Sequence, residues 1–502
     1  MKITAVTIKE AAQKENVLLA LAANNPVQQQ EFFSFLSKEN QTSLKAFAAE
    51  NFKAEEGEIR SLWLGSKNPK RIVLFGLGDR AKWNERKNPL IARKLVQYAK
   101  KEGFKEFATF IPKDILTDTK DMSVLFTTNA LMADFVFDIY KEKQKDAKPK
   151  LETIYIGVDS KDHKALTIGI TEGIIIGEET NRCRTLANTP GGDMTPTLLA
   201  KEASDTAKRA GFKATIFNEK KMRQLGMGAI LGVGRGSDAP PRFIILEYLK
   251  GPKNQKPLVL VGKGVTFDTG GLNLKPDNYI YEMHMDMSGG AAVIHGIASI
   301  ARLKLPINVV GLIPAVENMP SGSSYRPGDQ LKSLSGKTIE VLNTDAEGRV
   351  ILADALTYGL RYKPEVMIDL ATLTGAAHVA LGSHCSAVFS NDAKLQEHLI
   401  DIGNISGDYL WPLPLWDEFL PEIKGTFGDL ANIGNKDRYG GASHGAKFLE
   451  QFAGDTRFAH LDIAPRMTAI DSDFLSKGAS GVGVRLITQL AKEYPEILNS
   501  KS

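Results

Sequence analysis

Two carboxylates stand two residues apart in the loop Asn343–Arg349, whose sequence is NTDAEGR. A strand-like run, Thr338–Leu342, leads into this loop, and an apolar helical pattern, Arg349–Arg361, follows it at once. In open α/β sheets, ligands bind beyond the carboxyl ends of strands. This position favours a chemical role for Asp345 and Glu347. A solvated acidic turn that caps the helix explains the two residues equally well when they are taken alone.

A second group of polar residues lies upstream, again next to a strand-like run. Lys263 and Asp268 follow the run Leu258–Val261, Lys275 comes shortly after, and Asp286 precedes another helical pattern. Glycines flank these positions, which lets the backbone approach a ligand closely. We expect these loops to meet the NTDAEGR loop at one edge of a sheet.

The acidic members of this predicted site are Asp268, Asp286, Asp345 and Glu347. Four converging carboxylates without counter-charge would repel one another and raise their pKa values. Two divalent ions supply four matching positive charges, and in two-metal hydrolases such ions lie about 3.5–4 Å apart and activate a water molecule. The alternative is that each acid is a separate turn residue paired with a surface lysine. Loop composition alone does not separate the two interpretations.

The amino-acid composition is that of an ordinary soluble globular protein. Its 502 residues include 63 Lys and Arg against 59 Asp and Glu, so the formal net charge of +4 gives no argument for nucleic acid. The two cysteines, Cys183 and Cys385, exclude a disulfide framework and a thiolate zinc site, which suits a reducing compartment. No apolar run reaches the length of a membrane span. We therefore expect a cytoplasmic protein.

Strand-like and helical segments alternate along the whole chain, which predicts α/β architecture with mostly parallel sheets flanked by helices. We expect a smaller N-terminal domain, residues 1–165, and a larger catalytic domain, residues 166–502, which begins with a linking helix. The predicted strands are Asn16–Ala22, Arg71–Phe75, Phe107–Ile111, Thr153–Val158, Phe243–Leu249, Leu258–Val261, Ile307–Ile313, Thr338–Leu342, Val366–Leu370 and Ala387–Ser390. The predicted helices are Pro89–Glu102, Val124–Glu142, Thr167–Leu186, Thr197–Ala210, Gly290–Arg302, Arg349–Arg361 and Gly481–Lys492.

Other short motifs do not carry a function. Gly76-x-Gly78-x-x-Ala81 after the strand Arg71–Phe75 is a loose dinucleotide fingerprint, but no convincing ribose-binding acid follows, so a tight turn is the better interpretation. No H-E-x-x-H pair or nucleophile elbow occurs. The histidines form no ligand-spaced pair, and His284 is interpreted as a packing residue. Any metal site must therefore use mainly oxygen ligands.

Several longer segments occur together in one order, and together they resemble the leucyl (cytosol) aminopeptidase family of metallopeptidases. The resemblance covers about residues 165–495, whereas the N-terminal part matches in general character only. The segments are NTPGGDMTP from Asn188, VGKGVTFDTGG from Val261 with LKP from Leu274, MDMSGGAAV from Met285, ENMPSGSSYRPGD from Glu317, NTDAEGR from Asn343, DLATLTGAAHVALG from Asp369 and AHLDIA from Ala459.

The resemblance implies a two-metal site with named roles. It makes five residues the ligands of two divalent ions (Mn²⁺ or Zn²⁺, or Mg²⁺), namely Lys263, Asp268, Asp286, Asp345 and Glu347, with Asp268 and Glu347 bridging. Lys263 would bind as a neutral amine, which burial beside two cations favours. Lys275 and Arg349 match the two catalytic residues. Lys275 would stabilise the oxyanion, and Arg349 would hold bicarbonate, because a guanidinium stays protonated and cannot act as a base.

The resemblance also implies a pocket for the first side chain of a peptide and a homohexameric assembly. The pocket residues would be Met283, Thr372, Gly375, Ala464 and Met467. Thioether and small residues suit leucine or methionine, although methionine also fills gaps in ordinary cores. Two departures lie near the pocket: Pro465-Arg466 where many relatives have glycine, and His284 where lysine is common. The specificity prediction therefore depends on weaker matches than the catalytic one.

The function predicted from the sequence is release of N-terminal residues, preferably leucine-like, from peptides with a free amino terminus. Two alternatives remain open. In the first alternative, the chain is an aminopeptidase that prefers a different class of dipeptide, such as Cys-Gly. From another class, the chain is a nucleic-acid-binding accessory that uses its N-terminal domain, against which the nearly balanced charge argues.

Overall fold

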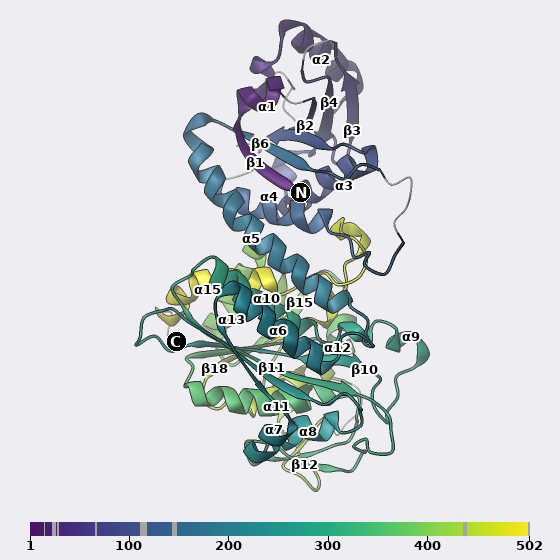
Figure 1. The fold of residues 1–502 in the computed structure, drawn as a ribbon, viewed down its shortest axis with the longest axis vertical. Coiled ribbons are helices and arrows are strands. Elements are labelled where there is room, and N and C mark those ends of the chain that lie inside the picture. The colour runs from purple at the N-terminus through teal and green to yellow at the C-terminus, as the bar shows by residue number, and fades with distance from the viewer. Residues whose placement is uncertain are drawn as a thin grey trace. The chain divides into compact units, whose positions relative to one another are not determined.

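The computed structural model describes residues 1–14, 16–22, 27, 30–65, 68–110, 118–142, 148–434 and 439–499. The chain forms two compact units (Figure 1). The first unit comprises Met1–Glu178 and Asp471–Ser476, and the second comprises Glu179–Ile470 and Lys477–Ser502. The division lies within helix α5 (His163–Asn188). The predicted boundary at residue 165 lies near the beginning of the same helix.

The first unit contains a six-stranded sheet in the order β1-β6-β5-β2-β4-β3. All neighbouring pairs are parallel except β3 and β4, so an antiparallel strand forms one edge. Its strands are β1 (Lys2–Thr7), β2 (Val17–Ala22), β3 (Ile59–Trp63), β4 (Arg71–Gly76), β5 (Glu106–Phe110) and β6 (Thr153–Val158). Its helices, besides the first part of α5, are α1 (Ile8–Lys14), α2 (Lys38–Asn51), α3 (Asn88–Glu102) and α4 (Thr119–Asp134).

Both faces of this sheet are covered, and β2, in the middle of the sheet, is apolar at every position. Leu19 and Leu21 of β2 pack in one core cluster with residues of α3 and α4. Leu18 and Ala20 pack in another cluster with residues of α1 and α2. Successive side chains of a strand point to opposite faces, so a strand buried on both sides has a continuous apolar sequence.

The second unit contains a larger, mixed sheet in the order β16-β15-β18-β14-β9-β11-β8-β7, with β10 also paired to β11. The central strands β18, β14, β9, β11 and β10 run parallel, whereas β15 and β8 run antiparallel to their central neighbours. The strands are β7 (Lys213–Phe217), β8 (Arg242–Leu249), β9 (Leu258–Gly262), β10 (Gly264–Asp268), β11 (Asn308–Asn318), β14 (Val366–Ala371), β15 (Ser386–Ser390), β16 (Leu410–Pro412) and β18 (Arg457–Asp462). A three-stranded sheet, separate from it, joins β12 (Gln330–Lys332), β13 (Thr338–Glu340) and β17 (Leu430–Ala431).

Helices cover both faces of the large sheet (Figure 1). Leu258 and Leu260 of β9 pack toward α6, α10, α13 and α15, while Val259 and Val261 pack toward α8, α11 and α14. The helices are α6 (Pro196–Ala210), α7 (Glu219–Leu225), α8 (Gly228–Gly234), α9 (Asp277–Ile280), α10 (Ser288–Arg302), α11 (Glu347–Gly359), α12 (Gly375–Leu381), α13 (Ala393–Ser406), α14 (Gly441–Glu450) and α15 (Val484–Asn499). The predicted fold class, α/β with mostly parallel sheets between helices, is confirmed.

Several predicted elements differ from the structure in their bounds, and three of them differ for a clear local reason. The helix predicted for Val124–Glu142 ends at Asp134, because Phe135 leaves helical geometry with ψ 134°. The helix predicted from Gly481 begins at Val484, since Gly481 and Gly483 have positive φ values. The predicted strand Thr338–Leu342 ends at Glu340 and belongs to the small sheet, not to the large one. Ile111, the last residue of another predicted strand, lies outside the described residues.

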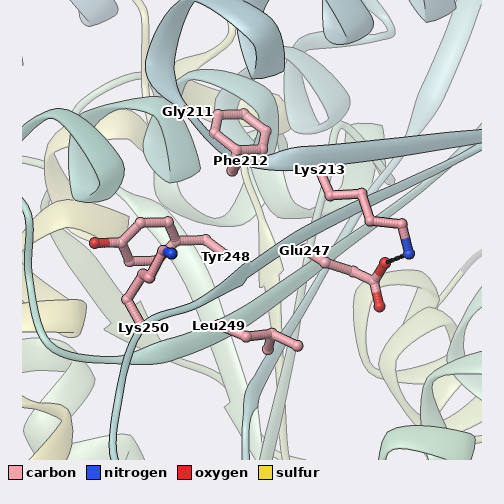
Figure 2. Close-up of a pocket in the computed structure, with 7 residues that line it drawn as sticks. All are labelled: Gly211, Phe212, Lys213, Glu247, Tyr248, Leu249 and Lys250. Carbon is pink, nitrogen blue, oxygen red and sulfur yellow. Dashed lines mark hydrogen bonds and ion pairs between the residues drawn. The ribbon is translucent and has the colours of Figure 1, made fainter.

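No helix in the described part of the chain is both long and apolar enough to cross a membrane. A hollow of about 360 Å³ lies at the β7 edge of the large sheet, where Figure 2 shows the ion pair Lys213–Glu247, 2.7 Å long, at its rim. The hollow is open and lacks a cluster of acids or a nucleophile. It contains none of the residues for which the sequence predicts chemistry.

Candidate active site

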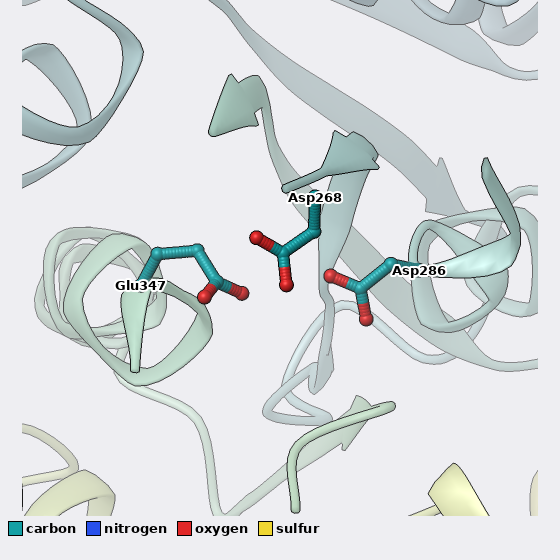
Figure 3. A group of neighbouring side chains, drawn as sticks. All are labelled: Asp268, Asp286 and Glu347. Atoms are coloured by element: carbon teal, nitrogen blue, oxygen red, sulfur yellow. The ribbon is translucent and has the colours of Figure 1, made fainter. Parts of the chain in front are cut away.

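Three of the predicted acids meet in the interior of the second unit. Asp268 ends β10, Asp286 stands just before α10, and Glu347 is the first residue of α11. One carboxylate oxygen from each lies within 4.8 Å of the others, and all three side chains are buried (Figure 3). These loops therefore meet in the structure, as expected from the sequence.

The parallel strands explain the convergence. The carboxyl ends of β9, β10, β11, β14 and β18 lead respectively to Lys263, Asp268, Asn318, Thr372 and Asp462. Because these five strands run in one direction, their ends meet at one edge of the sheet. The NTDAEGR loop reaches the same edge, as expected from the sequence. The strand before this loop, β13, belongs to the small sheet and not to the large one.

Two glycines after β10 let the chain turn tightly beside Asp268. Gly270 and Gly271 have φ values of 87° and 64°, a region that favours glycine. The Gly270 N–H donates to Asp268 Oδ1 at 2.8 Å. A Cβ on Gly270 would stand 2.8 Å from Asp345 Oδ1. These glycines therefore serve both the turn and the close approach of the two loops.

Lys263 lies among the acids and is 3% exposed. Its Nζ is 2.8 Å from Asp286 Oδ2, 2.8 Å from Glu347 Oε1 and 2.9 Å from the Thr372 carbonyl oxygen. Burial opposes the ammonium form, but the charges of Asp286, Glu347 and Asp268 outweigh it and raise the pKa of Lys263 above its ordinary value. With protein groups alone around it, Lys263 is therefore a cation, so the neutral amine expected of a ligand requires additional positive charge nearby.

Lys275 connects Asp268 to the NTDAEGR loop. Its Nζ is 2.8 Å from Asp268 Oδ2 and 2.5 Å from Asp345 Oδ1. Despite burial, the charges of Asp268, Glu347 and Asp345 raise the pKa of Lys275 above its ordinary value. Asp345 is thus brought to the cluster through Lys275. The structure therefore places the fourth predicted acid beside the first three.

Two of the acids have pKa values raised above those of ordinary aspartates. Burial, together with Asp268 and Glu347, raises the pKa of Asp345 to about 7. Burial also raises the pKa of Asp286 well above its ordinary value, although Lys263 acts in the opposite direction. With all four carboxylates ionised, the cluster would have two more negative charges than its two ammonium groups balance, and burial together with this excess raises the pKa values of Asp345 and Asp286. An excess of buried negative charge is the electrostatic condition that divalent cations satisfy.

The donor set fits a divalent cation. Carboxylate oxygens are the ligands that Mg²⁺ and Mn²⁺ prefer, and Zn²⁺ accepts them too. Glu347 Oε2 is buried and, among the described residues, has no hydrogen-bond partner. A buried acceptor without a donor is costly unless another group, such as a cation, satisfies it. The acids Asp268, Asp286 and Glu347 could therefore hold a metal ion.

Arg349 lies half a turn beyond Glu347 on α11 and is buried. Its Nη1 donates to the Asn432 carbonyl oxygen at 3.0 Å, and its Nε is without a hydrogen-bond partner in the described part of the chain. Burial lowers the pKa of Arg349 to about 10, so the guanidinium is charged at neutral pH. The site thus contains a buried cation whose Nε–H group has no acceptor in the described part of the chain. Such a group can bind an anion.

The five predicted pocket residues lie on elements around the cluster. Thr372 is closest to the acids: its Oγ1 donates to Asp286 Oδ1 at 2.7 Å. Met283 begins the short 3-10 turn η6 (Met283–Met285) before Asp286, and Met467 packs partly against the large core. Gly375 begins α12, which packs against the turn η10 (Ala464–Arg466) that carries Ala464. A Cβ on Gly375 would meet open space.

Asn318, at the end of β11, is a functional residue that sequence reasoning missed. Its Nδ2 donates to Asp268 Oδ1 at 2.8 Å and to the Thr344 carbonyl oxygen at 3.0 Å. The buried Tyr325 hydroxyl donates to the same carbonyl at 2.6 Å. Both residues belong to the ENMPSGSSYRPGD segment, which was noted as a motif without a role. Asn318 links the two halves of the site.

Asp462, at the end of β18, is a second missed residue. It is fully buried, accepts from Thr374 Oγ1 at 2.6 Å and from the Leu373 N–H at 3.1 Å, and so holds the loop that follows β14. Thr372 of that loop contacts both Lys263 and Asp286. Asp462 therefore holds in place the loop that carries Thr372. In the sequence, only the HLD run at the end of a strand indicates this residue.

The fold and the site together define a class of hydrolytic α/β enzyme with buried acids and lysines at the carboxyl edge of a parallel sheet. Comparison with known proteins narrows this class. The catalytic-domain profile of the cytosol aminopeptidase family matches residues 181–488, and the N-terminal-domain profile of that family matches residues 18–144. The chain belongs to the cytosol aminopeptidase family and is an aminopeptidase. The resemblance seen for about residues 165–495 thus extends into the N-terminal domain.

Individual relatives agree over most of their length. A probable cytosol aminopeptidase of Chlorobaculum tepidum is 42% identical over 459 residues, which cover 88% of this chain and 90% of that protein. A probable cytosol aminopeptidase of Nitrosococcus oceani is 46% identical over 380 residues, 75% of this chain and 74% of that protein. A third relative of the same description, from Nitrosospira multiformis, is 42% identical over 84% of this chain and 81% of its own length.

Proposed function

We propose that this chain uses two divalent metal ions to release N-terminal residues, preferably leucine or similar apolar residues, from peptides. The observation that carries the proposal is the buried cluster Asp268, Asp286 and Glu347, with Glu347 Oε2 unsatisfied. The residues that would hold the ions are Lys263, Asp268, Asp286, Asp345 and Glu347. Zinc or manganese is the expected metal, and magnesium is the alternative.

When bound, the metal ions would activate a water molecule and polarise the scissile carbonyl group. The free amino group of the peptide would bind at the same site, which confines cleavage to the first residue. Asp286 is kept in place by Thr372, and Asp268 by Asn318 and the Gly270 N–H. Orientation of ligands by such partners typically changes metal affinity or activity by about 10- to 100-fold.

Two cationic side chains have proposed catalytic roles. The Lys275 ammonium, beside Asp268 and Asp345, stabilises the negative charge that develops on the carbonyl oxygen. The Arg349 guanidinium holds bicarbonate, and its Nε is available for this because it has no hydrogen-bond partner among the described residues. A bicarbonate held there would supply a base, which the guanidinium itself cannot be.

The preference for a leucine-like first residue follows from the lining proposed for the pocket. Met283 and Met467 offer flexible apolar surface, and Gly375 and Ala464 leave space. A panel of aminoacyl amides and dipeptides tests this preference. A higher kcat/KM on Cys-Gly than on Leu-Gly would assign the chain to the other substrate class.

The assembly and the cellular location are also proposals. The family match supports a homohexamer, and the relatives' description as cytosol aminopeptidases supports a cytoplasmic enzyme. Light scattering coupled to size exclusion measures the first property. A monomer or dimer at micromolar concentration that is fully active would contradict the hexamer.

Substitution of Asp345 tests the metal assignment directly. We expect Asp345→Ala to lose at least one metal ion per subunit and to lower kcat/KM by at least 100-fold, because it removes a ligand and the partner of Lys275. Metal content is measured by mass spectrometry on purified protein, alongside rates on leucine amide. Asp205→Ala, on the exposed face of α6, is the matched control. Full metal content and activity in a folded Asp345→Ala protein would refute the assignment.

A further inference from the structure

The first unit contains a pocket that the aminopeptidase reaction does not use. It has a volume of about 350 Å³ and lies at the carboxyl ends of β2 and β4, beneath one face of α3. Leu21 is the last residue but one of β2, and Phe75 and Gly76 end β4. Every residue that lines the pocket belongs to the first unit, including Phe474 from the segment Asp471–Ser476. The carboxyl edge of parallel strands is a usual place for ligands.

The interior of the pocket is mainly apolar and aromatic. Phe75, Trp83 and Phe474 contribute rings, and Ile91 and Leu95 of α3 contribute aliphatic side chains. Pockets of a few hundred cubic ångströms with an apolar lining and a few polar groups are typical of small-molecule sites. The volume and lining fit a compact ligand with an aromatic or branched apolar body.

The rim of the pocket is positively charged. Lys94 and Lys101 lie two turns apart on the same face of α3, and Lys87 precedes that helix. Lys87 is neutralised by Glu56 at 2.8 Å. Lys94 lies over the ring of Phe474 at 5.2 Å, and neither Lys94 nor Lys101 has a carboxylate ion-pair partner in the described part of the chain. Two cations beside an apolar cavity favour an anionic ligand.

Hydrogen bonds hold the walls of the pocket in place. Trp83 Nε1 donates to Asn88 Oδ1 at 2.9 Å, which fixes the indole ring. Gln97 Nε2 donates to the Phe474 carbonyl oxygen at 3.3 Å. The buried Arg93 donates to the Asp473 carbonyl oxygen at 3.1 Å and anchors the segment before Phe474. The cavity is therefore preformed, and a ligand would not have to open it.

The Gly76-Leu77-Gly78 turn closes the end of the pocket next to β4. A Cβ on Gly76 would lie 2.0 Å from the Glu55 carbonyl oxygen, so this position admits only glycine. Gly78 has a φ of 79°. The motif is a tight turn, as the sequence indicates, and this turn shapes one wall of the cavity.

We propose that the N-terminal unit binds a small aromatic carboxylate in this pocket, its ring among Phe75, Trp83 and Phe474 and its carboxylate between Lys94 and Lys101. The site is independent of the metal cluster and of the proposed function. Binding needs no metal ion, and its loss leaves peptide hydrolysis intact.

Isothermal titration calorimetry with 4-phenylbutyrate, on the full-length protein, tests the proposal. The neutral 4-phenylbutanol has the same apolar body and is the matched ligand. We expect one binding site per chain for the acid, and at least 10-fold weaker binding of the alcohol. Equal affinity for acid and alcohol, or no binding of the acid at millimolar concentration, would overturn the proposal.

Three variants and one control variant locate the site. Lys94→Glu and Lys101→Glu should each weaken binding of 4-phenylbutyrate at least 10-fold. Lys45→Glu, an exposed lysine of α2 in the same unit, has the same change of charge and should bind as the parent does. Leu90→Trp fills the pocket without a change of charge and should also abolish binding. Melting temperatures show whether each variant is folded, and parental affinity in both Lys94→Glu and Lys101→Glu would refute the assignment.

Discussion

Asn318 shows how one neutral side chain can connect two halves of a charged site. Its amide N–H groups reach Asp268, on the loop after β10, and the carbonyl of Thr344, next to Asp345. These loops are more than seventy residues apart in the sequence. An amide donor orients a carboxylate without adding charge, so Asp268 keeps its full negative charge for a cation.

Substitution of Asn318 should affect metal binding more than stability. We expect Asn318→Ala to weaken metal affinity and to lower kcat by about 10- to 100-fold, the usual effect of losing a partner that orients a ligand. Asn318→Asp should be worse, because it places a like charge against Asp268. Metal titration followed by activity on leucine amide measures both effects. Unchanged metal affinity in Asn318→Ala would show that Asp268 does not need this donor.

Gly348 has a steric role that its place in the helix does not reveal. A Cβ at this position would lie 2.8 Å from Lys263 Nζ, so alanine would push the lysine away from Asp286 and Glu347. Alanine in place of glycine favours helix by about 1 kcal/mol. We expect Gly348→Ala to keep or raise the melting temperature while kcat/KM falls at least 10-fold. Gly322→Ala, where the added Cβ meets open space, should change neither quantity.

The sequence predicts the charged residues of the site but not the neutral ones that orient them. Asp345 and Glu347 stand out because they lie between a strand-like run and a helical pattern and because they match a family segment. Asn318 ends a buried strand, and Thr372, which the family resemblance marks as a pocket residue only, follows another. Neither residue type is rare at such positions, so only the folded distances to Asp268 and Asp286 reveal their roles.

At the scale of elements, α11 supports the site at one end and a neighbouring helix at the other. Glu347 and Arg349 occupy the first turn of α11. Asp354 lies two turns after Glu347 and is fully buried. Asp354 Oδ2 accepts from the Ala229 and Ile230 N–H groups at 3.0 Å each, at the beginning of α8. Asp354 Oδ1 accepts from the Leu334 N–H at 2.7 Å. One carboxylate thus caps a helix and fixes a loop.

Removal of this carboxylate should destabilise the second unit. Asp354→Ala leaves three buried N–H groups without an acceptor, and we expect a loss of about 3 kcal/mol, since each unsatisfied group costs about 1–3 kcal/mol. Asp354→Asn keeps one oxygen acceptor and should lose less. Chemical denaturation of the two variants and the parent measures the order. Equal stability of Asp354→Ala and the parent would contradict this account.

Elements with a strong apolar pattern were predictable, and those defined by tertiary context were not. The continuous apolar run of β9 and the run of β14, which only Asp369 interrupts, indicate central strands, and both are confirmed. β18 lies beside β14, but its sequence RFAHLD contains charged residues and histidine, which hide a central strand. The histidine is buried there because His460 Nδ1 pairs with Asp369 at 2.7 Å, a contact that no local pattern reveals. β13 has strand character, yet only pairing with β12 and β17 assigns it to the small sheet.

At the scale of the whole molecule, α/β class and membership of the family followed from the sequence, and both are confirmed. The division of the chain did not follow in detail. The six residues Asp471–Ser476 belong to the first unit although the second unit surrounds them in sequence. They are held there by Arg93 and Gln97 of α3. Hydrogen bonds over nearly four hundred residues of sequence leave no periodic signal.

Glu179, the first residue of the second unit, ties together three helices of that unit. It is fully buried in α5 and accepts hydrogen bonds from Arg209 at the end of α6 and from Arg302 of α10, both at 2.7 Å. His295 of α10 lies 2.9 Å from it. Although burial opposes the charged form, the contacts with His295, Arg209 and Arg302 hold the pKa of Glu179 well below its ordinary value.

Substitution of this carboxylate should alter both the stability of the second unit and its dependence on pH. We expect Glu179→Gln to lose about 3 kcal/mol at pH 7, because removal of one partner leaves buried arginines uncompensated. A carboxyl group with a depressed folded pKa stabilises the protein above its unfolded pKa, about 4.3, and this contribution is lost as the pH falls. The difference in melting temperature between parent and variant should therefore be constant from pH 6 to 8 and shrink below about pH 4. A difference that stays constant down to pH 3 would show that the charge of Glu179 does not stabilise the fold.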